Sequence, residues 1–393
     1  MKKSPQLYIV YFTVFLDLLG FGILIPLLPY VAESYNVSKI EIGFLMASYS
    51  LAQFIFSPIW GRLSDRIGRR PIILLSLLGS SSGYLLFALA DSMTMLFVAR
   101  IIAGCASGNI SAAQAIVADT LPPEERTKGM GMIGASIGLG FMLGPALAGF
   151  LVSEHSYALP FIVAASLSGL DLILAFFFLP ETVNNRNDQN IERRRFSLFT
   201  LKNSLGVKFI PHLFSISLIY HIALASMESS FALFGHAAFG MNERENSYIM
   251  FLVGVIMVAI QGGVIRSASK RYGDRNLLLF GIMGVTIGFA LIGYATSFKI
   301  LIAATIFMAI ASGFIGPSIS SLISQFSAKD VQGGILGLNQ SMASMGRIIG
   351  PIVGTILFQW LNPRAPFYAG SILLMFSFLI IIPLRRGLRD NQK

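Results

Sequence analysis

The stretch GRLSDRIGRRP (residues 61–71) places five charged side chains within eleven residues, between two long hydrophobic runs. The chain around it is 54% hydrophobic and only 12% charged. Soluble domains carry about 25% charged residues. So large an apolar excess cannot be buried in an aqueous core, which indicates a lipid bilayer as the solvent. The stretch is therefore predicted to be a polar loop between two membrane-spanning helices.

Twelve apolar runs of about 20 residues follow one another along the chain, each long enough to cross a bilayer as a helix. We expect them at about 7–31, 41–60, 71–90, 94–118, 129–152, 158–179, 209–234, 246–266, 276–295, 299–322, 335–360 and 366–384. The predicted fold class is an all-α membrane protein.

Lysine and arginine are distributed unevenly between the loops. If the amino terminus is cytoplasmic, 23 of the 29 basic residues fall on the cytoplasmic side and four on the other; Arg100 and Arg347 fall inside spans. This bias predicts a multi-pass protein of the cell membrane with both termini in the cytoplasm. It also accounts for the formal charge of +10 without a nucleic-acid partner.

A polar interval separates spans six and seven and divides the chain near its midpoint. A shift of 205 residues places RIGRR (66–70) over RYGDR (271–275), and a shift of 206 places Gly144-Pro145 over Gly350-Pro351. We therefore expect a duplicated architecture of two six-helix halves, 1–180 and 209–393, joined by a cytoplasmic linker at 181–208. Such duplication is typical of secondary transporters.

Four motifs together resemble the major facilitator superfamily, and within it the twelve-helix drug:proton antiporters. They are GRLSDRIGRRP in loop 2–3, LDLLGFGILIPLLP (16–29) in the first helix, RIIAGCASG (100–108) in the fourth and GFMLGPALAG (140–149) in the fifth. The resemblance covers nearly the whole chain. It implies a transporter driven by a proton gradient, without a cofactor or a bound metal.

The resemblance implies that the loop motif is a conformational latch between the halves, formed by Gly61, Asp65, Arg66, Gly68, Arg69 and Arg70. The glycines permit a tight loop, and the arginines suit a surface of anionic headgroups. The alternative is that the arginines only determine topology. Because Lys270 stands at the position of Asp65 in the duplicated loop, we predict Asp65 to be the switch.

The fifth span carries the antiporter helix motif, Gly140, Gly144, Pro145 and Gly149. Small residues four apart let helices pack closely, and proline permits a bend. The motif is interpreted as a bendable hinge, with ordinary tight packing as the alternative.

Ionisable residues inside spans are costly and mark candidate functional sites. For proton coupling we predict Asp17, Arg100, Asp171 and Glu228, because a carboxyl group in apolar surroundings can bind and release a proton. Glu228 is the strongest candidate, in a region that resembles the seventh helix of multidrug exporters. Asp17 matches the first-helix Asp of tetracycline exporters, helix packing is its alternative, and a structural role is the favoured reading of Asp171.

The predicted substrate cavity combines an acid, adaptable apolar side chains and polar residues within spans. Its members are Phe21, Gln53, Asn109, Tyr220, Met227, Glu228, Phe231, Phe234, Asn339 and Gln340. Each apolar member has plain packing as its alternative.

We therefore expect a monomeric, proton-coupled antiporter that exports amphipathic, cationic or zwitterionic drugs, and not an enzyme. The alternatives are an exporter of a specific metabolite, sugar or lipid, and a transporter-like sensor. Tetracycline itself is in doubt, because tetracycline exporters typically carry Asp where Gly83 stands. GMGMIG (129–134) and GASIG (134–138) resemble enzyme motifs, but they lack the strand–turn–helix setting which that chemistry requires.

Overall fold

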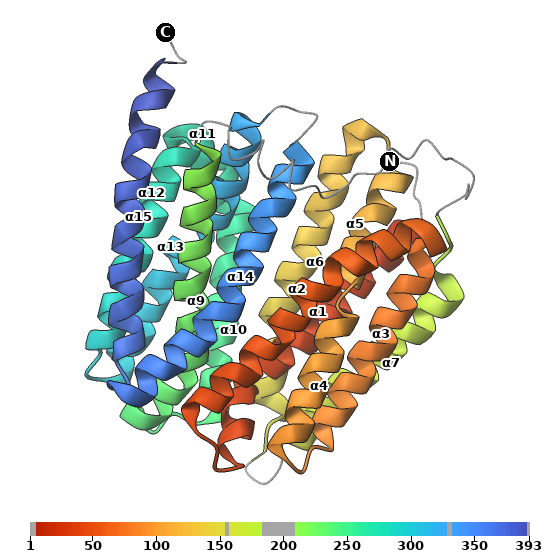
Figure 1. Ribbon diagram of the computed structural model, residues 1–393, viewed down its shortest axis with the longest axis horizontal. Coiled ribbons are helices and arrows are strands. Elements are labelled where there is room, and N and C mark those ends of the chain that lie inside the picture. Colours follow the sequence, from red (N-terminus) through yellow and green to blue (C-terminus); the bar gives the residue numbers. More distant parts are fainter. Residues whose placement is uncertain (1–4, 154–156, 183–208, 328–331, 391–393) are drawn as a thin grey trace. The chain divides into compact units, whose positions relative to one another are not determined.

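The computed structural model describes residues 5–153, 157–182, 209–327 and 332–390, and nearly all of them are helical (Figure 1). The helices of the first part of the chain are α1 Pro5–Glu33, α2 Lys39–Ile67, α3 Arg69–Ala88, α4 Met93–Ala106, α5 Asn109–Thr120, α6 Pro123–Leu151 and α7 Ala158–Phe178. Those of the second part are α9 Ile210–Phe239, α10 Glu243–Ala259, the π-helix η1 Ile260–Val264, α11 Ile265–Tyr272, α12 Asp274–Tyr294, α13 Phe298–Phe326, α14 Gln332–Trp360 and α15 Ala365–Asp390.

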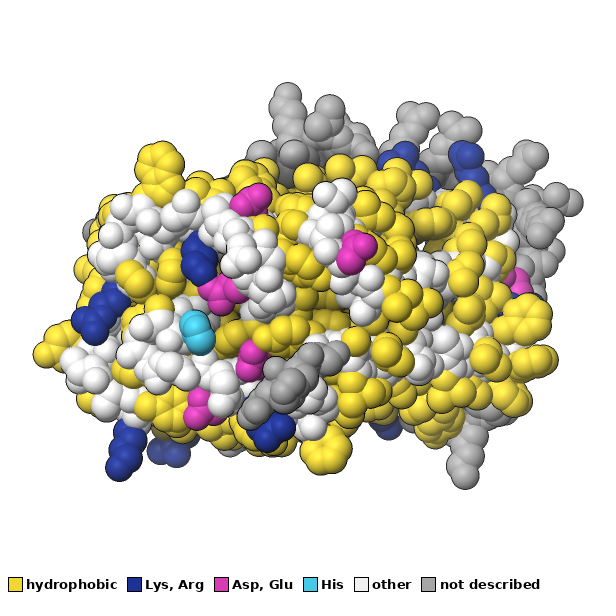
Figure 2. Space-filling model, turned by 90° about the horizontal axis from the view of Figure 1, so that it is seen from below, with side chains coloured by type: hydrophobic (Ala, Val, Ile, Leu, Met, Phe, Trp, Pro, Cys, Tyr) yellow, Lys and Arg dark blue, Asp and Glu magenta, His cyan; other side chains and the backbone are white. Residues whose placement is uncertain are grey.

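The all-α membrane fold expected from the sequence is confirmed. Among the described residues, eleven helical stretches are long and apolar enough to cross a membrane, and the shorter apolar helix Ala365–Ile381 lies where the twelfth span is expected. Large apolar side chains stand exposed along the helices, such as Phe150 at 77% and Phe177 at 72%. Exposed apolar side chains of this kind are expected of helices whose outer faces meet lipid. Figure 2 shows the face that lies below in Figure 1, where acidic, basic and other polar side chains stand among hydrophobic ones.

Two of the expected spans are interrupted. The fourth is broken between α4 and α5 at Ser107-Gly108, without a proline. The eighth runs through α10 and α11, with η1 between them. A π-turn inside a helix often marks a functional position.

Contacts group the described residues into two compact units. The N-terminal unit comprises 5–182 and Met241–Gly254, and the C-terminal unit comprises 209–240 and 255–390. The units differ from the predicted halves in one segment, because the start of α10 packs on the N-terminal unit. Within that unit Asn246, fully buried, donates to the Pro26 carbonyl at 2.9 Å, and Arg244 donates to the Val152 carbonyl at 3.3 Å.

In each unit one pair of helices is brought together by glycines. Gly140 and Gly144 of α6 face α1, where a Cβ on Gly144 would lie 2.6 Å from the carbonyl carbon of Gly22. Gly346, Gly350 and Gly354 of α14 face α9 in the same way, and a Cβ on Gly350 would lie 2.6 Å from the Ile222 carbonyl oxygen. Backbones approach this closely only where no side chain intervenes. The hinge function predicted for α6 remains a prediction.

Replacing Gly144 with alanine should therefore destabilise the fold. The new methyl group meets α1 backbone, which cannot move aside, and overpacking of this kind costs about 1–3 kcal/mol. The matched control is Gly134→Ala on the same helix, where a Cβ has nothing within 4 Å. We expect a lower apparent melting temperature in detergent for Gly144→Ala, and an unchanged or higher one for Gly134→Ala because alanine favours helix. Equal melting temperatures for the two variants would contradict this packing.

Candidate functional site

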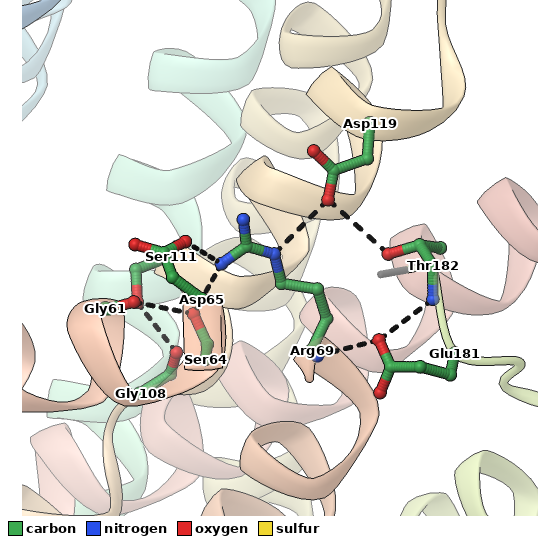
Figure 3. Close-up of polar contacts among 9 residues, drawn as sticks. All are labelled: Gly61, Ser64, Asp65, Arg69, Gly108, Ser111, Asp119, Glu181 and Thr182. Carbon is green, nitrogen blue, oxygen red and sulfur yellow. Dashed lines mark hydrogen bonds and ion pairs between the residues drawn. The ribbon is translucent and has the colours of Figure 1, made fainter. Parts of the chain in front are cut away.

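The loop between α2 and α3 is organised around Arg69 (Figure 3). Its guanidinium donates to Ser64 Oγ at 2.7 Å, forms an ion pair with Asp65, and reaches Asp119 Oδ2 through Nε at 3.2 Å. The Arg69 side chain is only 13% exposed, whereas those of Asp65 and Asp119 are 51% and 34% exposed. Arg69 therefore ties the end of α2 to the end of α5, and we call this group of four residues the Arg69 clamp.

The start of α3 is capped by a carboxylate from beyond α7. Glu181 accepts the backbone N–H of Arg69 at 2.9 Å and that of Arg70 at 3.2 Å. Gly68 has a φ of 109°, and any Cβ there would collide with Glu181, at 2.1 Å from Oε2. Two features therefore favour glycine at 68. One is its positive φ, and the other is the closeness of the Glu181 carboxylate that caps α3.

The remaining residues of the loop motif have separate surroundings. Arg70 donates to the Phe176 carbonyl and stacks over the Phe176 ring, with its guanidinium carbon 5.4 Å from the ring centroid. Arg66 is exposed, and a Cβ on Gly61 would have nothing within 4 Å. Asp65, the predicted switch, pairs with Arg69, and Arg69 also contacts Ser64 and Asp119. The latch between halves remains a prediction.

The sequence analysis missed two acids of this site, Asp119 and Glu181. Each stands just past or at the end of a predicted span, far from the loop in sequence. Nothing in their local sequence indicates that α5 and the end of α7 bring them to Arg69. An acid at the end of a span beside a basic loop is a signal that could have raised them as candidates.

The equivalent loop of the C-terminal unit has the opposite charge at its centre. The shift of 205 residues places Asp274 over Arg69. Asp274 accepts hydrogen bonds from Ser269 of α11 and from Ser321 and Gln325 of α13, the last at 2.8 Å. Asp274 is thus a carboxylate with neutral hydrogen-bond donors. It stands at the sequence position where the N-terminal unit has Arg69, a cation with acidic partners.

Asp17 lies inside the N-terminal unit among polar groups of two other helices. Ser80 of α3 donates to Asp17 Oδ1 at 3.3 Å. The side-chain amide of Asn109, the first residue of α5, faces the same carboxylate without reaching close hydrogen-bond geometry. Tyr84, 5% exposed, lies against Gly20 one turn further along α1. Asp17 is thus held among neutral partners and is not fully buried.

Arg100 of α4 is 5% exposed and is held by aromatic rings. Its guanidinium carbon lies 4.6 Å from the Tyr49 ring centroid and 5.9 Å from that of Phe21, and Nη2 reaches the Met46 carbonyl at 3.5 Å. Stacking on aromatic faces stabilises a desolvated guanidinium. Tyr49, which the sequence analysis did not single out, is thus the closest aromatic neighbour of this charge.

Asp171 of α7 is 1% exposed and is fixed by one hydrogen bond, from Thr13 Oγ1 at 2.9 Å. Its Oδ2 has no partner among the described residues. Asp171 therefore links α7 to α1, and both its coupling role and its structural alternative remain predictions.

Glu228 belongs to the C-terminal unit and is partly buried in α9. The charge of Arg347 on α14 acts on it electrostatically, and Arg347 also donates to Ser344 Oγ at 3.1 Å. The sequence analysis gave Arg347 no role. About two helix turns before Glu228 on α9, the Tyr220 hydroxyl shares a hydrogen bond with Ser312 of α13.

The other members of the predicted cavity are placed differently by the structure. Phe231 and Phe234 are 3% and 0% exposed, Met227 is 8% exposed, and the Phe234 ring packs on Phe367 of α15 at 5.0 Å. These three side chains are buried within their unit, and their place in a substrate cavity remains a prediction. Gln53, Phe21 and Asn339 are partly buried, and Gln340 is exposed.

Comparison with known proteins agrees with the fold and the motifs described above. The family model of the Major Facilitator Superfamily matches residues 10–268 and 263–393. Multidrug resistance protein 1 of Bacillus subtilis (strain 168) is 30% identical over 383 residues, which cover 97% of this chain and 96% of that protein. Tetracycline resistance protein, class E, of Escherichia coli is 31% identical, over 91% of this chain and 89% of that protein.

Among solved structures, a bacterial homologue of the human lysosomal transporter Spinster superposes with a TM-score of 0.83 at 14% identity, and 99% of each chain is covered. At that identity the likeness concerns the fold alone. The family model and the two relatives each span most of the chain. The chain therefore belongs to the Major Facilitator Superfamily and is a multi-pass membrane transporter of small molecules.

Proposed function

We propose that this transporter exports amphipathic organic cations or zwitterions in exchange for protons. It works as a monomer by alternating access, with both termini in the cytoplasm. The observation that carries the proposal is a carboxyl group inside a membrane helix of each unit, Asp17 on α1 and Glu228 on α9.

The two acids have different surroundings. Asp17 accepts a hydrogen bond from the neutral Ser80 and faces the amide of Asn109, and Glu228 lies in the electrostatic field of Arg347. In apolar surroundings such a carboxyl group favours its neutral form, and an approaching cation favours release of the proton. An acid that exchanges a proton for a cation is what antiport requires.

The chemical class of the cargo is supported by the surroundings and by the relatives. Phe21 contacts Tyr49 and Phe141 with ring centroids 5.0 and 5.7 Å apart, which forms an aromatic surface beside Arg100. Aromatic rings suit large apolar molecules, which supports an amphipathic cargo. The name of the Bacillus subtilis relative, a multidrug resistance protein, agrees with this cargo.

A second candidate is export of one specific compound, and tetracycline is the first to test because a relative carries that name. Against it, Gly83 of α3 has no room for the acid typical of tetracycline exporters. A Cβ there would lie 3.0 Å from the Ala103 methyl and 3.1 Å from the Ala99 carbonyl of α4.

Removing the titratable oxygen at Glu228 or Asp17 should uncouple transport. In everted membrane vesicles, Glu228→Gln and Asp17→Asn should lower ethidium transport by about tenfold or more, because neither amide binds or releases a proton. Glu228→Gln should affect ethidium, a cation, more than tetracycline, a zwitterion.

The matched control is Asp91→Asn, which removes an exposed carboxylate between α3 and α4 and should transport at the wild-type rate. Wild-type ethidium transport by Glu228→Gln would remove this acid from the mechanism. If the wild type releases no protons for any member of a panel of cationic dyes and drugs, the antiport proposal is wrong.

The Arg69 clamp should also be required for transport. Arg69→Gln loses the ion pairs with Asp65 and Asp119 together, so we expect ethidium transport to fall by about tenfold at normal membrane abundance. Asp119→Asn should fall less, because Arg69 keeps Asp65. Arg62→Gln, in the same loop but bonded only to the Pro58 carbonyl of its own helix among the described residues, is the charge-matched control. Similar losses in Arg62→Gln and Arg69→Gln would indicate a general charge effect instead.

A further inference from the structure

The break between α4 and α5 is built by side chains from outside the broken helix. Ser107 and Gly108 leave the helical path, and the Gly108 N–H is shared between the Ala106 carbonyl at 2.7 Å and Ser76 Oγ of α3 at 3.2 Å. Ser76 is fully buried. A backbone N–H freed inside a membrane protein must find such a partner. The break is therefore a fixed part of the unit, stabilised by α3.

Trp60, the last residue of α2 before the loop motif, stabilises the other side of the break. Its indole N–H donates to the Cys105 carbonyl, which the break leaves without its usual helical partner. The ring also covers Gly108 so closely that a Cβ there would lie 2.7 Å from the Trp60 ring. Trp60 thus fixes where α4 stops and where α5 starts.

The short helix α5 connects two functional groups of the N-terminal unit. At its first residue, Asn109 Oδ1 accepts the N–H of Ile110 at 2.8 Å, which leaves Nδ2 directed to the Asp17 side. Near its last residue, Asp119 is bound by Arg69. The ten residue steps from Asn109 to Asp119 span about 15 Å at 1.5 Å per residue.

The body of α5 is packed as one rigid piece. Ala112, Ala113, Ile116 and Val117 are at most 1% exposed and belong to the same hydrophobic cluster as α1 and α3 residues. A displacement at the Asn109 end is therefore transmitted along the helix to the Asp119 end. The other titratable groups whose charges act around Asp17 are Asp171 of α7 and Tyr84 of α3, which also feels Arg100.

We propose that α5 is a strut that joins the Asp17 site to the Arg69 clamp, and that Trp60 is the positioning residue that sets the start of this strut. When Asp17 becomes neutral, Asn109 loses the anion it faces, and the strut carries the change to Asp119 and the loop between α2 and α3. The inference rests on the proposed function only in that Asp17 is the group that gains and loses the proton.

The chain contains its own reporter, because Cys105 is the only cysteine and adjoins the break. The experiment measures the alkylation rate of Cys105 by N-ethylmaleimide in the full-length protein in native membranes, at one fixed pH. Trp60→Phe keeps the ring and loses the N–H, so the break should open more often and the rate should rise by about fivefold. The control is Trp360→Phe at the other tryptophan, which is 76% exposed and should stay within about twofold of wild type.

A double-mutant cycle then tests the coupling. Asp17→Asn and Arg69→Gln, at the two ends of the strut, should each change the Cys105 rate by about threefold in the Trp60 protein, and by less than about 1.5-fold in the Trp60→Phe background. A tryptophan that only stabilises the fold would leave the same fold-change in both backgrounds. That outcome, or an unchanged rate in Trp60→Phe, overturns the proposal.

A second variant covers the case in which Trp60→Phe does not reach the membrane. Ser76→Ala removes the second side chain that binds the break. It should raise the alkylation rate of Cys105 and weaken the response of that rate to Asp17→Asn, as Trp60→Phe does. A wild-type rate with a wild-type response overturns the proposal. Ethidium transport is measured in the same membranes. If the wild type transports no ethidium but the cycle is non-additive, the proposed function fails and the strut stands. If it transports ethidium and the cycle is additive, only the strut fails.

Discussion

A polar or charged group inside a lipid-embedded helix bundle is tolerated only where a neighbouring helix supplies its partner. This constraint decides which residues of the chain can meet. The Asp17 carboxyl requires Ser80 from α3, and Asp171 requires Thr13 from α1. Each such contact also fixes the helices that provide it. The same contacts between helices therefore satisfy the polar groups and fix the packing of the helices. Glycines such as Gly144 contribute by letting the helix backbones approach closely.

Much of the fold could be predicted from the sequence, because span length and hydropathy depend on local composition alone. The spans and the all-α class follow from runs of apolar residues and from the charges between them. The polar loop expected at 61–71 is wrong in extent, because α2 and α3 continue through it and leave only Gly68 outside a helix. The two interrupted spans could not be predicted in the same way. The fourth span reads as one apolar run, and its break depends on Trp60 and Ser76, which stand on other helices.

The functional residues likewise divide into those that the local sequence identifies and those that depend on contacts between distant helices. Arg69 and Gly68 are recognised from their motif, and Asp17 from its cost inside a span. Asp119 and Glu181 become partners of the loop only when α5 and the end of α7 are brought beside it. Conversely, Phe231 and Phe234 have the composition expected of a cavity, yet the packing of α9 on α15 places them in a core. Residue type alone cannot distinguish an aromatic side chain that lines a cavity from one that fills a contact between helices.

The opposite charges at the centres of the two duplicated loops have a consequence for the surrounding solution. The Arg69 clamp depends on attraction between full charges, and two of its carboxylates are partly exposed, so dissolved salt screens it. Asp274 is held by hydroxyl and amide donors, whose bonds depend far less on ionic strength. A rise in salt concentration should therefore weaken the contacts of Arg69 more than those of Asp274. Ionic strength is thus a variable that acts on one of these two related segments and largely spares the other.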